Sequence, residues 1–66
     1  MKLKETIKVF VMAPHQRAGQ YGFLDVYEDD TGREKIKGIE TADGFMWLVR
    51  GEEGEHFYAK PNDLKK

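Results

Sequence analysis

The stretch FMWLVRGEEGEHFYAK, residues 45–60, decides the fold. Phe45, Trp47 and Val49 are spaced by two, which is the period of a β-strand. The segment GEEGE follows, with Gly54 where a three-residue hairpin loop needs a residue at positive φ. The stretch is therefore predicted to form an antiparallel hairpin.

The register of this hairpin assigns its side chains to two faces. A three-residue loop places Arg50 opposite His56 and Leu48 opposite Tyr58. The other face of the hairpin then carries Trp47, Val49, Phe57 and Ala59.

The same period, with many β-branched and aromatic residues, continues through the rest of the chain. No stretch shows a helical face. Strands are predicted at residues 4–12, 20–28, 33–41, 45–51 and 55–60. A short C-terminal helical turn, KPNDLK, follows the last of them.

Two more connections read as tight hairpins. A loop at residues 30–32 (Asp-Thr-Gly) places Val26 opposite Ile36, at the cost of Glu28 opposite Glu34. The dipeptide DG at positions 43 and 44 is predicted to be a two-residue turn. The longer segment APHQRAGQYG is predicted to protrude as a loop.

These registers predict a core on one face of the sheet. It comprises Ile7, Val9, Val11, Leu24, Val26, Ile36, Gly38, Trp47, Val49 and Phe57.

The opposite face is also rich in apolar side chains, although a single antiparallel sheet usually presents polar residues there. Exposed apolar patches often mark interaction sites, and tyrosine and methionine are frequent anchors. In the alternative interpretation, these residues form a second small core under the first strand or the loop. The predicted partner-binding residues are Tyr21, Phe23, Met46, Leu48, Arg50, His56 and Tyr58.

Five short strands, a long first loop, tight later hairpins and a closing helical turn resemble a Src-homology-3-like barrel. The resemblance rests on WLVRGEEGEHFYAK and PNDLKK, where an aromatic pair precedes a proline-containing turn with Asp63 and Leu64. In many barrels of this class the turn precedes a final strand, and here we expect none. The resemblance implies a binding module for proline-rich peptides, nucleic acid or another subunit. An oligonucleotide-binding barrel is the second choice of fold.

Charge is abundant but balanced, with 11 basic and 12 acidic residues in 66. Broad non-specific binding to nucleic acid needs a stronger positive field. A local basic patch remains the alternative function. Its candidate residues are Lys4, Lys8, His15, Arg17 and Arg50.

Catalysis and metal binding have little support in the sequence. The chain has no cysteine and no serine, and His56 has only neighbouring glutamates to orient it. The acidic run at residues 28–30 is typical of a hairpin tip that bonds to its own backbone. We expect no enzyme activity, no cofactor and no bound metal.

The sequence thus predicts an all-β protein, one small five-stranded antiparallel barrel over residues 1–66. No apolar run reaches the roughly 20 residues of a membrane helix, and MKLKETIKV lacks a signal-peptide core. We expect a cytoplasmic protein-interaction module of the accessory kind common in bacteria and phages. It would bind another protein, or a second copy of itself, through the apolar sheet face.

Overall fold

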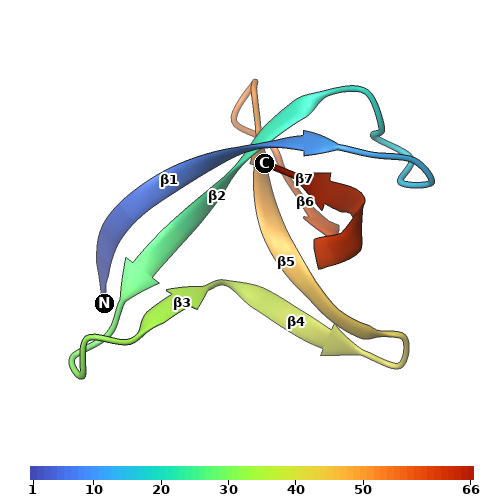
Figure 1. Ribbon diagram of the computed structural model, residues 1–66. Coiled ribbons are helices and arrows are strands. Elements are labelled where there is room, and N and C mark those ends of the chain that lie inside the picture. Colours follow the sequence, from blue (N-terminus) through green and yellow to red (C-terminus); the bar gives the residue numbers. More distant parts are fainter.

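One antiparallel sheet curls into a half-barrel in the computed structural model, which describes residues 1–66 (Figure 1). The predicted all-β class and the short C-terminal helical turn are confirmed. The elements are β1 (Lys2–Val11), β2 (Tyr21–Glu28), β3 (Glu34–Ile36), β4 (Gly38–Thr41), β5 (Gly44–Gly51), β6 (His56–Ala59), the 3-10 turn η1 (Pro61–Asp63) and β7 (Leu64–Lys65). No helix is long and apolar enough to cross a bilayer.

The strand order is β4-β5-β2-β1-β7, with β3 also paired to β2 and β6 also paired to β5. The single strand predicted at residues 33–41 is in fact divided at Lys37. Its first half pairs with β2 and its second half with β5, so the chain passes from one side of the half-barrel to the other. Gly38 permits this corner, because a Cβ there would meet the Met46 carbonyl oxygen and the Phe45 ring.

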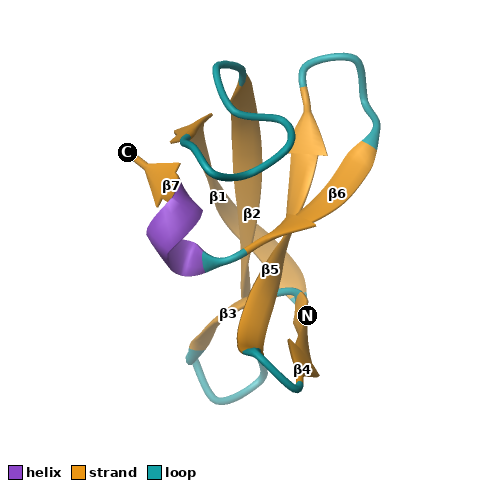
Figure 2. Ribbon diagram, turned by 90° about the vertical axis from the view of Figure 1, so that its right-hand side faces the viewer, coloured by secondary structure: helices purple, strands orange, loops and turns teal.

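The expectation that no strand follows the helical turn was wrong. After η1, Leu64 pairs with Val11 and Lys65 with Phe10, so that β7 adds to β1 (Figure 2). The turn itself is anchored to the end of β1, because the Met12 N–H donates to the Asp63 carbonyl at 2.7 Å. β7 therefore extends the sheet beyond its first strand.

β2 and β5 pair where Gly22 lies opposite Gly51 and Phe23 lies opposite Arg50. Both glycines are buried. A Cβ on Gly22 would lie 2.6 Å from the Val49 Cγ1, closer than real side chains approach each other. The missing side chain therefore lets β2 and β5 lie against each other.

The core forms on the concave face, as predicted. Fully buried side chains are Val9, Val11, Leu24, Val26, Val49 and Ala59. Ile7, Ile36, Trp47, Phe57 and Leu64 are partly buried against them. Gly38 is exposed and was wrongly assigned to the core.

The hairpin at residues 45–60 has the predicted register. Arg50 pairs with His56 and Leu48 with Tyr58, and Gly54 has a φ of 88°. Val26 likewise pairs with Ile36, as predicted for the preceding hairpin.

The two-residue turn lies at Ala42 and Asp43, not at the predicted Asp43-Gly44, because Thr41 pairs with Gly44. The Thr41 hydroxyl accepts a hydrogen bond from the Asp43 N–H at 3.2 Å and donates to the Gly44 carbonyl at 2.8 Å. These bonds close the turn one residue earlier than the DG dipeptide suggests. The resulting register shift is two residues, so every side chain keeps its predicted face.

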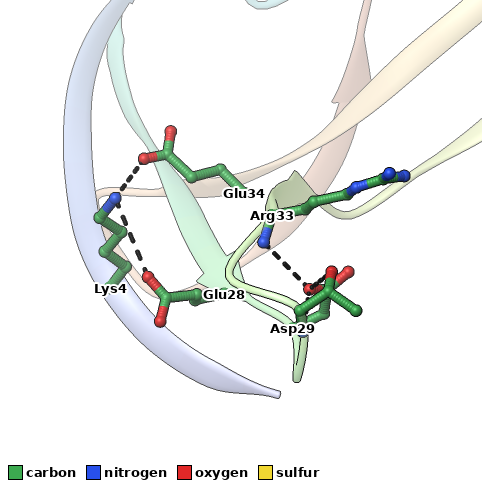
Figure 3. Close-up of polar contacts among 6 residues, drawn as sticks. Lys4, Glu28, Asp29, Arg33 and Glu34 are labelled. Atoms are coloured by element: carbon green, nitrogen blue, oxygen red, sulfur yellow. Dashed lines mark hydrogen bonds and ion pairs between the residues drawn. The ribbon is translucent and has the colours of Figure 1, made fainter.

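The predicted clash of Glu28 with Glu34 exists in the register but is relieved by a lysine from β1. Figure 3 shows the Lys4 ammonium between the two carboxylates, bonded to Glu34 and 4.0 Å from Glu28. The bond to Glu34 raises the pKa of Lys4. Like charges across the strands are therefore tolerated.

The neighbouring loop is closed by Asp29. Its Oδ1 accepts hydrogen bonds from the Thr31 hydroxyl at 2.6 Å and from the backbone N–H groups of Thr31 and Arg33 at 2.9 and 3.0 Å. The Thr31 hydroxyl is the largest cause that lowers the pKa of Asp29 to about 2. The carboxylate is thus used by its own hairpin tip.

The segment predicted to protrude instead folds back onto the hairpin of β5 and β6. The His15 ring lies 5.4 Å from the Phe57 ring, and the Arg17 guanidinium lies 4.7 Å above it. Arg17 also donates to the Glu55 carboxylate at 3.0 Å. The loop packs on the partly buried Phe57 ring at the edge of the core, a contact that the polarity of the segment alone does not show.

Gly54→Val should destabilise the protein by about 1–3 kcal/mol, because a β-branched residue must adopt a left-handed conformation there. Glu52→Val, in the same loop, is the control because its φ is not positive. Urea unfolding followed by Trp47 fluorescence measures both. Equal stability of the two variants would contradict the turn geometry.

Gly22→Ala should also cost about 1–3 kcal/mol, by overpacking against Val49. The cost should shrink in a Val49→Ala background, where the Cγ1 methyl that the new Cβ would strike is gone. A double-mutant cycle by urea unfolding tests this coupling. Strictly additive costs would show that the contact with Val49 is not the cause of the destabilisation.

Candidate interaction face

The convex side of the sheet, opposite the core, is the candidate site, and we call it the outer face. Strand pairing places Lys8, Phe23, Arg50 and His56 in one row across β1, β2, β5 and β6. The seven residues predicted to bind a partner all project from this face: Tyr21, Phe23, Met46, Leu48, Arg50, His56 and Tyr58.

Several large apolar side chains on the outer face remain in contact with solvent. Tyr21, Ile39 and Tyr58 are 44%, 42% and 40% exposed. Phe23, Met46 and Leu48 are half-buried among them. β1 lies beside β2 rather than over this face, and the loop packs on Phe57 of the concave side. No second core covers these residues.

Each aromatic ring that β2 projects from the outer face has a cation near it. The Lys8 ammonium lies 4.5 Å from the centre of the Tyr21 ring, and the Arg50 guanidinium lies 5.0 Å from that of Phe23. The Lys37 ammonium lies 5.1 Å from the Tyr27 ring. These cation–π pairs make the face both apolar and positively charged.

Asp25 and Arg50 form the central ion pair of the outer face. The Arg50 Nη2 and Nε atoms donate to the two carboxylate oxygens of Asp25 at 3.0 and 3.2 Å, and the Thr6 hydroxyl donates at 2.9 Å. The hydrogen bond from Arg50, with that from Thr6 and the charges of Arg50 and His56, lowers the pKa of Asp25 despite its partial burial. The Arg50 guanidinium is therefore already paired with a carboxylate and is not free to bind a phosphate.

A small depression of about 70 Å³ lies beside this ion pair. Since a water molecule occupies about 30 Å³ in the liquid, the depression holds little more than water. It is lined by Asp25, Tyr27, Lys37, Leu48, Arg50 and His56.

The residues of the alternative nucleic-acid site are scattered and mostly neutralised. Lys4 is bonded to Glu34, Arg17 to Glu55 and Arg50 to Asp25. Only Lys8 and His15 have no carboxylate partner.

His15 holds the loop rather than a ligand. Its Nδ1 accepts a hydrogen bond from the Arg17 backbone N–H at 2.9 Å. The neutral ring then carries its hydrogen on Nε2, which donates to the Tyr58 carbonyl oxygen at 2.8 Å. The sequence shows the histidine but not its partner, which lies 43 residues away.

Sequence reasoning missed the contribution of the last residues. Lys65 and Lys66 lie beside Lys8, Phe10 and Tyr21 because β7 pairs with β1. The signal was the run LKK, in which an apolar residue facing inward precedes a lysine facing outward.

No group of three or more histidine, aspartate or glutamate side chains is arranged to hold a metal ion. Comparisons with protein-family models, curated proteins and solved structures found no match to this chain. We therefore infer the function from the geometry of the chain itself.

The Asp25 carboxyl should titrate below its ordinary range, and Arg50→Met should move its pKa upward. Because the folded-state pKa is lowered, the stability from this pair is present above the ordinary aspartate pKa and is lost as the pH falls below it. Carboxyl-carbon NMR titration and urea unfolding of both proteins between pH 7 and pH 2.5 test this. An unchanged Asp25 titration in the variant would refute the assigned cause.

Proposed function

We propose that the protein is a non-enzymatic interaction module that binds a partner protein through its outer face. One observation carries this proposal: Tyr21, Ile39 and Tyr58 remain exposed on the same face as the half-buried Met46 and Leu48. Large apolar side chains that stay exposed on one face of a small protein are typical of an interaction surface.

A different protein suits the outer face better than a second copy. A two-fold dimer brings the same patch of both copies together. Such a dimer would place Lys8 and Lys37 of both copies, four positive charges, in one interface. The carboxylate in the middle of the face, Asp25, is already bonded to Arg50. A partner with apolar side chains and some negative charge avoids this repulsion.

A nucleic-acid function through the predicted basic set has less support. Three of its five members are bonded to carboxylates, so they add little positive field. The ion pairs would have to open before those side chains could reach a phosphate.

The resemblance to Src-homology-3-like barrels belongs to this proposal. In many barrels of that class a short turn precedes the final strand, as η1 precedes β7 here. Barrels of that class are mostly binding modules. The fold class alone does not specify the partner, so the partner must be inferred from the side chains of the outer face.

Leu48→Lys should abolish partner binding, weakening it by about tenfold or more, or at least about 1.4 kcal/mol. It places a charge at the centre of the apolar surface while the half-exposed position keeps the fold intact. Phe45→Lys is the matched control, since Phe45 is exposed on the same strand but projects to the other side. Quantitative affinity capture from an extract of cells that express the protein compares the two variants with the wild type.

Circular dichroism melts and light scattering accompany that comparison. Unfolding of Leu48→Lys would place Leu48 in the core and refute the outer face as a docking surface. Equal capture by all three proteins would do the same. Concentration-dependent dimerisation lost in Leu48→Lys would assign the face to a second copy instead.

A further inference from the structure

A basic hollow lies where β1, β2 and β7 meet, at one edge of the outer face. Its volume is about 430 Å³, within the range of about 300–1,000 Å³ typical of ligand pockets. It is lined by Lys8, Val9, Phe10, Tyr21, Lys65 and Lys66. We call it the lysine corner.

The three lysines of the corner have no carboxylate within ion-pair distance. Elsewhere Lys4, Lys35, Arg17 and Arg50 each lie within 4.0 Å of an acidic side chain. The hairpin loops, by contrast, carry free carboxylates at Asp30, Asp43, Glu52 and Glu53. Lys2, Arg33, Lys37 and Lys60 also lack a carboxylate partner, but they belong to separate segments of the chain. The corner differs in that three unpaired lysines line one hollow of a chain whose net charge is −1.

The corner also has an apolar wall. Phe10 and Tyr21 pack edge to face with their ring centres 5.2 Å apart, and Tyr21 is 44% exposed. A hollow with aromatic carbons on one side and ammonium groups on the other fits a ligand that combines an apolar group with negative charge.

We propose that the lysine corner binds an acidic segment of the partner protein. Carboxylates of that segment would meet Lys8, Lys65 and Lys66, and an apolar side chain would pack against Phe10 and Tyr21. This inference rests on the proposed function and specifies the chemistry of the partner. It adds a charged anchor to the apolar contact of the outer face.

A single-stranded nucleic acid is the other anionic polymer to consider, and the geometry favours it less. Base binding of that kind uses aromatic rings with a free face. The Lys8 ammonium already lies over the Tyr21 ring, and Phe10 packs against the same ring. Carboxylates can meet the lysines without displacing either contact.

The test is selection of random twelve-residue peptides displayed on phage against the immobilised protein. An extended peptide of this length spans up to about 40 Å, enough to reach from the corner across the outer face. We expect the selected peptides to combine aspartate or glutamate with a leucine or an aromatic residue. A labelled consensus peptide is then measured by fluorescence anisotropy.

The double variant Lys65→Glu with Lys66→Glu should weaken that peptide at least about tenfold. Lys2→Glu with Arg33→Glu makes the same change in net charge away from the corner and should leave binding unchanged. Circular dichroism melts establish that both double variants fold. Affinity of the wild type should fall as salt rises.

The two proposals fail differently. Selected peptides without acidic residues would overturn the lysine corner, and so would equal peptide binding by the two double variants. If Leu48→Lys still loses partner binding in that case, the outer face is upheld. If binding is lost in the double variant Lys65→Glu with Lys66→Glu but kept in Leu48→Lys, the corner is upheld and the outer face is overturned. Failure to select any peptide would overturn the corner as a peptide site. Tighter binding of a labelled dT12 oligonucleotide than of the peptide would assign the corner to nucleic acid and overturn it as well.

Discussion

The close contact of β2 with β5 at Gly22 is the constraint on which the rest of the structure depends. A chain of 66 residues without cysteine must obtain its stability from a core. One sheet encloses such a core only by curling. Because Gly22 has no side chain, Val49 fits against it and β2 can pair with β5. The curl brings Val9, Leu24 and Ala59 onto one buried cluster. It leaves the other side of the same strands facing water.

Local patterns predicted most of this arrangement, because the relevant interactions are local. The GEEGE loop set the pairing of β5 with β6, and the two-residue period separated the core from the outer face. The turn at Ala42 was misplaced because a threonine hydroxyl, rather than the glycine, closes it. That error left the faces intact because the register moved by two residues.

The features that escaped prediction involve partners far apart in the sequence. β7 comprises only Leu64 and Lys65, and a segment of two residues is too short to show a period. It pairs with β1 because the preceding turn η1 is hydrogen-bonded to the end of β1. The ion pairs of Lys4, Arg17 and Arg50 join residues 25 to 38 positions apart. The basic residues chosen from the sequence therefore suggested a stronger positive field than the paired side chains provide. That choice also overlooked the free lysines at residues 65 and 66.

The hydrogen bond between His15 and the Tyr58 carbonyl attaches the long loop to β6. The carbonyl of Tyr58 holds the long loop, while the ring of the same residue stands exposed on the outer face. The imidazole can serve the Arg17 N–H and this carbonyl together in only one neutral form. A proton added to the ring removes the acceptor and releases one of the two tethers. The long loop and the outer face thus both depend on Tyr58, the first on its carbonyl group and the second on its ring.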